Sequence, residues 1–146
     1  MWWKHGIIGK LTIFAGMNRI LKTVRHYPLT VVTAAVIWVV CLMPVPETPL
    51  SHVSLVDKWT HVAMYCMLCS IVWTEYIRGH KSIVWGRAFV VACVAPLIMG
   101  GLIEIAQATC TGGRRSGDWL DFVADGVGVL LGLPIGILLA KCLARR

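Results

Sequence analysis

Four long apolar segments constrain the fold of this chain more than any other feature of its sequence. The first contains no charged residue and lies between Pro28 and Pro46. The segments are 29–45, 59–77, 88–107 and 120–142. Because roughly 20 mostly apolar residues cross the hydrocarbon core as a helix, this pattern predicts an all-α integral membrane protein built as a four-helix bundle.

The composition excludes an ordinary soluble or disordered protein. Hydrophobic residues make up 58% of the chain and charged residues 14%, whereas soluble domains average about 45–50% and about 25%. The six cysteines lie mostly in apolar segments without zinc-site spacing, so we interpret them as buried thiols. A disulfide between Cys41 and Cys110, both near one face of the membrane, is an alternative that the sequence leaves open.

The basic residues predict the orientation. Eleven of the 14 Lys and Arg residues precede the first segment, follow the second, or lie at or beyond the end of the fourth, so both termini are expected in the cytoplasm. Residues 1–27 carry too many charges to span and are predicted to form an amphipathic helix on anionic lipid at the membrane surface, ahead of a membrane domain at 28–146. Because topology explains the net charge of +7, nucleic-acid binding is not expected.

Polar residues of three segments converge at the outer side of the membrane. Glu104 and Gln107 lie one helical turn apart at the end of the third segment. Asp57 and His61 are likewise one turn apart at the start of the second. An ionisable group at mid-bilayer costs at least about 2.5–3.5 kcal/mol, so such groups should face each other or a wet cavity. The predicted site comprises Asp57, Lys58, His61, Glu104, Gln107, Arg115, Asp118, Asp121 and Asp125.

A structural reading of the same residues stays open. Asp57, Arg115 and Asp118 would then be solvated anchors in the headgroup zone, and the deeper residues would form a polar network that joins the helices. On the fourth segment the acids continue into Gly128, Gly132 and Gly136, spaced four apart. Small residues at this spacing admit a close neighbour, either another helix of the chain or a second copy in an oligomer.

The order of these residues resembles the VanZ-like membrane proteins, a family named for a component of glycopeptide-antibiotic resistance clusters. The resemblance covers roughly 31–136. It rests on Asp57-Lys58-x-x-His61, on Glu104-x-x-Gln107, and on Arg115-Ser-Gly117-Asp118-x-x-Asp121-x-x-x-Asp125-x-x-Gly128. It implies a small multi-pass protein of the bacterial cytoplasmic membrane, with some members tied to teicoplanin resistance. The family commonly has Asn where this chain has Asp125, and the extra carboxylate requires a proton, a cation or Arg115 to neutralise it.

Three functions fit these residues, and recognition of a lipid headgroup or a cell-envelope, glycopeptide-related ligand is the first. In that hypothesis Lys58 and Arg115 bind phosphate or carboxylate oxygens. The remaining ligand-binding residues would be Asp57, Gln107, Asp118 and Asp125.

The second hypothesis is an intramembrane enzyme that acts on a lipid phosphate or a lipid-linked sugar. Its catalytic residues would be His61, Glu104 and Asp121, acting as general acid and base or with a divalent cation. The third is a proton-linked carrier that uses His61 and the buried acids as a relay.

Overall fold

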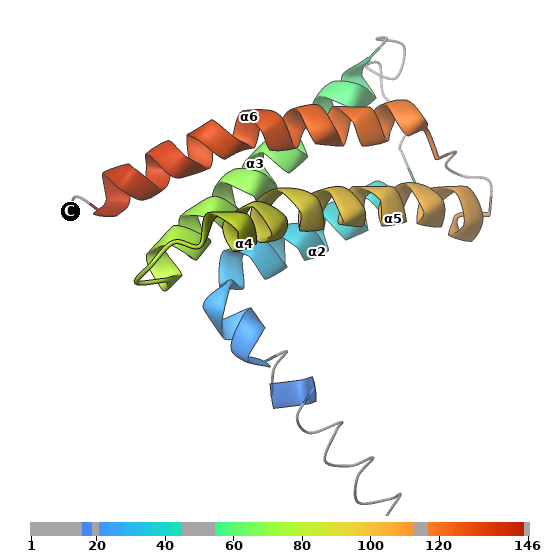
Figure 1. Cartoon of the computed structure of the whole chain (residues 1–146). Helices are drawn as coiled ribbons and strands as arrows, with labels where there is room; N and C mark the ends of the chain where they lie inside the picture. The colour runs from blue at the N-terminus through green and yellow to red at the C-terminus, as the bar shows by residue number, and fades with distance from the viewer. Residues whose placement is uncertain (1–15, 19–20, 45–54, 113–116, 145–146) are drawn as a thin grey trace, which may run out of the picture.

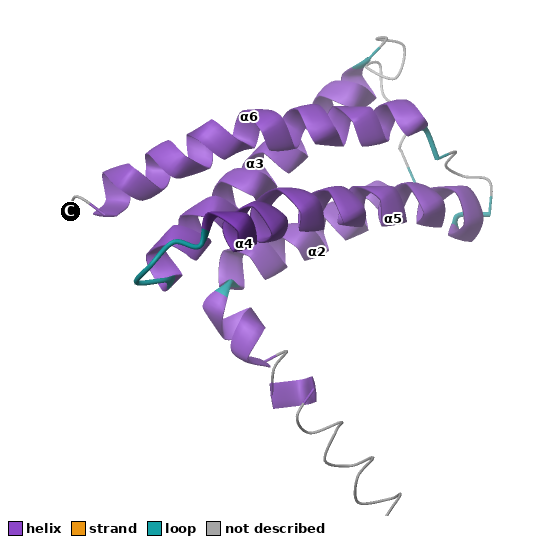
Figure 2. Ribbon diagram, viewed as in Figure 1, coloured by secondary structure: helices purple, strands orange, loops and turns teal. Residues whose placement is uncertain are grey.

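The computed structural model describes residues 16–18, 21–44, 55–112 and 117–144. Within these ranges the regular secondary structure is helical throughout (Figure 2), which confirms the predicted all-α class. The elements are α2 (Pro28–Leu42), α3 (Val56–Gly79), α4 (Trp85–Phe89), the π-helical turn η2 (Val90–Val94), α5 (Ala95–Cys110) and α6 (Trp119–Ala144). Of the predicted amphipathic segment, only 16–18 and 21–27 are described, and 16–18 and 21–26 are helical.

The helices share two ends. Figure 1 shows α6 lying across α3, while α2 and α5 run alongside one another. The end of α5 and the starts of α3 and α6 lie together, and we call this the site end. The start of α2, the start of α4 and the end of α6 lie at the opposite end (Figure 1).

Two described helices are long and apolar enough to cross a membrane. They are Trp85–Cys110 and Trp119–Leu143, and a third is counted if Gly16–His26 and Pro28–Leu42, bent by 98°, form one span. Large apolar side chains are exposed on the helices, among them Leu130 at 72%. An apolar surface of this kind requires cover by lipid or protein. The chain is therefore a membrane protein.

Pro96 lies within the third predicted segment, where one turn of the helix becomes wider but the helix does not end. Pro96 lacks an N–H, and its ring crowds the carbonyl four residues earlier in a regular α-helix. The turn η2 relieves this conflict, because the Ala95 N–H donates to the Val90 carbonyl five residues back. The helix then continues through α5 to Cys110 and carries Glu104 to the site end.

Glycines bring α6 against α3 along the most extensive helix interface of the described chain. Gly128, Gly132 and Gly136 all face α3; a Cβ at Gly132 would lie only 2.5 Å from the carbonyl oxygen of Cys66. The Ser70 hydroxyl donates to the Gly132 carbonyl at 3.1 Å. The glycine spacing allowed either another helix of the chain or a second copy as the close neighbour. In the structure the neighbour is α3 of the same chain.

Glu75 of α3 caps α2 at the opposite end from the site. The N-cap residue Tyr27 gives α2 no side-chain cap, and Pro28 follows it. The Glu75 carboxylate accepts hydrogen bonds from the Leu29 N–H at 2.9 Å, the Thr30 N–H at 3.0 Å and the Thr30 hydroxyl at 2.7 Å. These bonds satisfy helix-terminal donors that have no partner within α2, and they fix α2 to α3.

Candidate functional site

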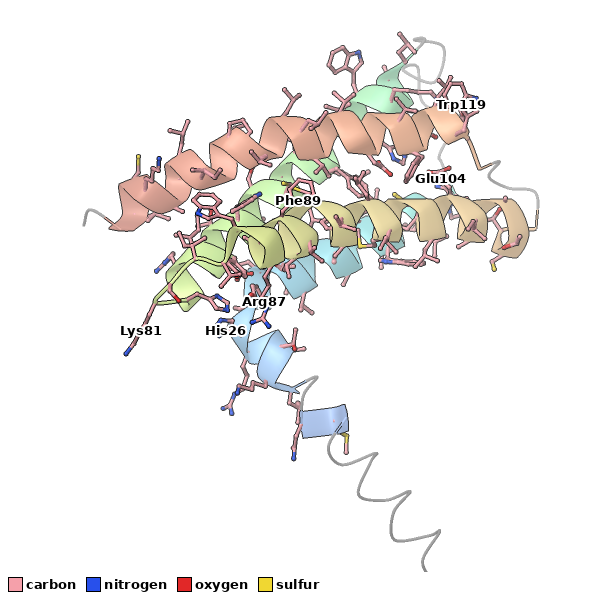
Figure 3. All side chains as sticks on the ribbon, in the orientation of Figure 1. His26, Lys81, Arg87, Phe89, Glu104 and Trp119 are labelled. Atoms are coloured by element: carbon pink, nitrogen blue, oxygen red, sulfur yellow. The ribbon has the colours of Figure 1, made fainter. Side chains whose placement is uncertain are left out.

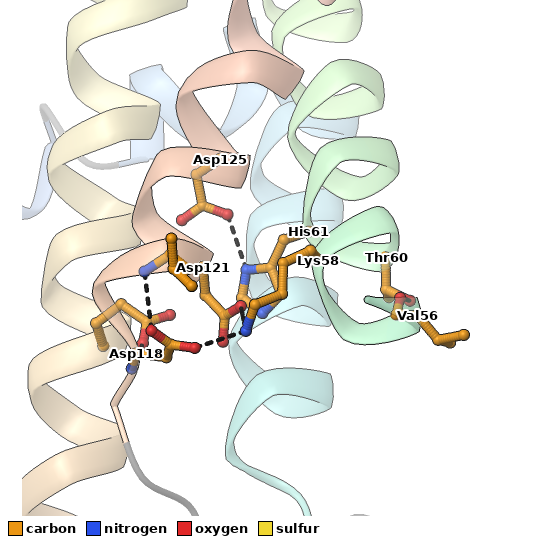
Figure 4. Close-up of polar contacts among 9 residues, drawn as sticks. Val56, Lys58, Thr60, His61, Asp118, Asp121 and Asp125 are labelled. Atoms are coloured by element: carbon orange, nitrogen blue, oxygen red, sulfur yellow. Dashed lines mark hydrogen bonds and ion pairs between the residues drawn. The ribbon is translucent and has the colours of Figure 1, made fainter. Parts of the chain in front are cut away.

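The outermost part of the site is an ion-pair bridge between α3 and α6. The Lys58 ammonium lies 2.6 Å from Asp118 Oδ2 and 2.8 Å from Asp121 Oδ1. Figure 4 shows Lys58 reaching from α3 to both acids. The hydrogen bond from Lys58 holds the pKa of the Asp118 carboxyl below its usual value. Lys58 therefore pairs with acids of its own chain, whereas we expected from the sequence that it would bind phosphate or carboxylate oxygens of a ligand.

Asp118 also begins α6. Its Oδ1 accepts the Leu120 N–H at 2.9 Å, as an N-cap residue does. Its own N–H donates to Glu104 Oε2 of α5 at 2.8 Å. Gly117, just before it, packs so closely on α5 that a Cβ there would lie 2.5 Å from the Glu104 carbonyl. One residue thus joins the start of α6 to both α3 and α5.

A buried His–Asp pair lies one turn deeper. His61 Nδ1 is 2.8 Å from Asp125 Oδ1, and the two side chains are 2% and 1% exposed. Figure 4 shows this contact above the Lys58 bridge. Asp125 therefore contacts His61 of α3, and a protonated His61 would supply the cation that the extra carboxylate requires. Arg115 lies outside the described residues.

Two carboxylate oxygens of the site are buried with neither a hydrogen bond nor an ion pair among the described residues. They are Glu104 Oε1 and Asp125 Oδ2, and the Tyr65 hydroxyl is in the same condition. A Cβ at Gly100 of α5 would contact Asp125 Oδ2 and would lie 3.1 Å from the Tyr65 hydroxyl, so this glycine leaves room for the Asp125 carboxylate. A buried acceptor without a donor is costly, so these atoms are where a ligand donor, a proton or a cation gains most.

Acids outnumber bases at the site. Five carboxylates lie here, from Asp57, Glu104, Asp118, Asp121 and Asp125, against the cations of Lys58 and, when protonated, His61. Two sets of three ligand atoms lie within 4.8 Å of one another, one from Asp57, His61 and Asp121 and the other from His61, Glu104 and Asp125. Carboxylate oxygens with an imidazole suit a divalent cation such as Mn²⁺ or Zn²⁺. His61 belongs to both sets and is the centre of the site.

The structure brings most of the predicted residues together. His61, Glu104, Asp121 and Asp125 are buried or nearly so at the site end, and Asp57 is exposed beside His61 and Asp121. Figure 3 shows Glu104 and Trp119 at this end, with His26, Lys81 and Arg87 at the opposite one.

Gln107 makes a contact away from this cluster. Its side-chain amide donates to the Cys41 carbonyl of α2 at 2.9 Å, and it is 1% exposed. It therefore ties α5 to the end of α2. Cys41 is buried, Cys110 is exposed, and no disulfide joins them in the structure.

Tyr65 is the site residue that sequence reasoning missed. Its hydroxyl is buried near Asp125 Oδ2, and the residue is 0% exposed. The available signal was spacing, because Tyr65 follows His61 by four residues and so shares its helix face.

Comparisons with family models, with curated proteins and with solved structures give no match to this chain. The function has to be inferred from the contacts at the site end.

Proposed function

We propose that this chain is a VanZ-like, four-span protein of the bacterial cytoplasmic membrane, with both termini in the cytoplasm. Support comes from the helix bounds, because α2, α3, Trp85–Cys110 and α6 coincide with the four apolar segments to within a few residues. The helix α3 is not one of the two helices that are apolar enough to span, and the ionisable residues in its first and last turns lower its mean hydropathy. The asymmetry of Lys and Arg supports the orientation.

Reporter fusions test the orientation. A fluorescent protein fused after Arg146 is expected to fluoresce, and alkaline phosphatase at the same position is expected to be inactive. An active phosphatase there would refute the cytoplasmic C-terminus. The same pair of fusions between residues 112 and 117 is expected to give the reverse result.

We further propose that the site end recognises the polar headgroup of a cell-envelope lipid in the outer leaflet. The observation that carries this proposal is the pair of buried, unpartnered acceptors, Glu104 Oε1 and Asp125 Oδ2. A headgroup that offers N–H or O–H donors, such as an ammonium, an amide or a sugar hydroxyl, satisfies them.

The same geometry bears on the ligand's charge. Lys58 already contacts Asp118 and Asp121, so a bare anionic headgroup would face an excess of carboxylates. The proposal is therefore for a donor-rich headgroup, with the hydroxyl of Tyr65 as a further contact.

A matched pair of lipids tests the preference for donors. Phosphatidylethanolamine and phosphatidylcholine of identical chains share a phosphate, but only the first has N–H donors. Native mass spectrometry of the detergent-solubilised protein with an equimolar mixture is expected to retain phosphatidylethanolamine about tenfold better, because one hydrogen bond to a charged group contributes about 1.5–3 kcal/mol.

Variants connect the preference to the site. Glu104→Gln is expected to reduce the preference to near one, and Asp125→Asn is expected to weaken it. Glu75→Gln changes an acid to its amide at the opposite end and is the control, expected to leave the preference unchanged. Equal retention of the two lipids by the unmodified protein, or equal effects of Glu104→Gln and Glu75→Gln, would refute recognition at this site.

The two metal-ligand sets favour a second candidate, an intramembrane enzyme that hydrolyses a lipid phosphate ester. A divalent cation held by His61, Glu104 and Asp125 would polarise the phosphate. Asp121 would accept the proton of the attacking water; the new P–O bond would form as the ester P–O bond breaks, and the proton would pass to the leaving alkoxide. Asp121 lies in the other set, with Asp57 and His61, which supports this role.

Metal analysis separates the two candidates. The enzyme predicts about one bound Mn²⁺ or Zn²⁺ per chain in the purified protein, lost in His61→Ala, and phosphate release from a dialkyl phosphatidic acid in detergent. Protein that carries no metal after incubation with each cation and releases no phosphate would refute the enzyme and leave headgroup recognition standing.

A further inference from the structure

A long apolar groove lies away from the site, along the surface of α3 and α6. Its volume is about 980 Å³. Side chains spaced four apart form both walls: Ala63, Met67 and Ile71 on α3, and Ile135, Leu139 and Leu143 on α6. None of the predicted site residues that the structure describes lines it.

The groove has the length of a lipid chain. Its lining on α3 extends from Ala63 to Gly79, which at 1.5 Å per residue corresponds to ~24 Å. The hydrocarbon core of a bilayer is ~30 Å thick. A chain seated in the groove would thus follow α3 through most of the core.

Basic residues gather where the groove reaches the opposite end. Arg25, His26 and Arg78 line it there and are exposed. Glu75 is the one acid among the described lining residues, and its carboxylate already accepts hydrogen bonds from the start of α2. The mouth is therefore positively charged.

Ring contacts hold this mouth together. The His26 ring lies 5.0 Å from the Tyr27 ring and 5.2 Å from the His80 ring, measured between centroids. A Cβ at Gly79 would be 2.5 Å from His26 Nε2. These contacts bring the segment that carries Arg25 against the end of α3, next to Arg78.

We propose that this groove binds an anionic glycerophospholipid, with an acyl chain along the walls and the phosphate between Arg25 and Arg78. Arginine suits phosphate because its planar fork donates two parallel hydrogen bonds. The basic asymmetry of the sequence assigns this end to the inner leaflet, where anionic lipids attract basic residues. The proposal is independent of ligand recognition at the site end.

Competition between two lipids tests the charge. Native mass spectrometry with equimolar phosphatidylglycerol and phosphatidylcholine of identical chains is expected to retain phosphatidylglycerol preferentially. The double variant Arg25→Ala/Arg78→Ala is expected to lower that preference about tenfold. The control is Lys81→Ala/Lys141→Ala, which removes the same net charge from exposed residues outside the groove lining and is expected to retain the preference.

A second variant tests the groove itself. Ala63→Trp places a bulky side chain in the wall at an exposed helical position and leaves the basic mouth unchanged. It is expected to lower retention of both lipids severalfold. The proposal is overturned if the lysine control lowers the preference as much as the arginine pair does, or if Ala63→Trp leaves retention unchanged.

Discussion

Replacing Gly132 by alanine is expected to weaken the interface between α3 and α6. The new Cβ would lie 2.5 Å from the Cys66 carbonyl oxygen and 2.8 Å from Cys69 Cβ, whereas ordinary contact begins at 3.4 Å. Because the obstacles include the backbone and a Cβ, no side-chain rotation relieves them, and the helices must separate locally by roughly 0.9 Å. A gap of this size forfeits about a quarter to a half of each dispersion contact across the interface.

The magnitude follows from three contributions. Overpacking costs about 1–3 kcal/mol, and lengthening the hydrogen bond from Ser70 to the Gly132 carbonyl removes about 0.6 kcal/mol, the average for such bonds between membrane helices. Alanine recovers up to about 1 kcal/mol of helix propensity. The free energy of unfolding is therefore expected to fall by about 1–3 kcal/mol.

Gly126 provides the matched control on the same helix. A Cβ there would be 3.8 Å from Leu97 Cδ2, an ordinary contact, so Gly126→Ala is expected to be neutral or to stabilise by up to about 1 kcal/mol. The assay is equilibrium unfolding in mixed micelles titrated with dodecyl sulfate and followed by circular dichroism. Equal unfolding free energies for the two variants would refute the close packing inferred for Gly132.

Three further predictions concern the polar contacts. Glu75→Ala removes every acceptor that caps α2 and is expected to cost about 1–3 kcal/mol in the same unfolding assay. Because Lys58 lowers the pKa of Asp118, their interaction stabilises the fold above the ordinary carboxyl pKa of about 4, and this stabilisation is lost as the pH falls through the lowered value. Asp118→Asn is expected to reduce the loss of stability at acid pH in unfolding titrations from pH 6 to pH 2. An unchanged loss of stability would contradict the linkage. Gln107→Leu removes the donor to the Cys41 carbonyl and is expected to destabilise by about 1 kcal/mol without altering the lipid preference at the site end.

The helical spacing of the polar residues, together with the apolar segments, was sufficient to predict which of these residues meet at the site end. Asp118, Asp121 and Asp125 lie on one stripe of α6, and the structure turns that stripe toward Lys58 and His61 of α3. The prediction succeeded because helical spacing fixes a common face and apolar segments fix a common depth.

The spacing of residues along a helix does not determine which neighbouring helix each of them contacts. Gln107 shares a helix face with Glu104, yet it contacts the Cys41 carbonyl of α2, because the packing of α5 between two helices divides that face. The cap on α2 was missed for a related reason. Two features pointed to this cap: α2 starts at Pro28 without a capping side chain, and the lone acid Glu75 lies at the same depth. Only the tertiary fold brings these two features together.

The Glu75 cap has a consequence for how the chain enters a bilayer. The helix α2 has 15 residues, a length of ~22 Å, so it is shorter than the ~30 Å hydrocarbon core. Its first N–H groups acquire their acceptor only when α3 is beside it. During synthesis α2 emerges before α3, and until Glu75 arrives those donors have no acceptor from α3. We therefore expect α2 and α3 to integrate into a membrane together, and we expect Glu75→Ala to reduce the retention of α2 there.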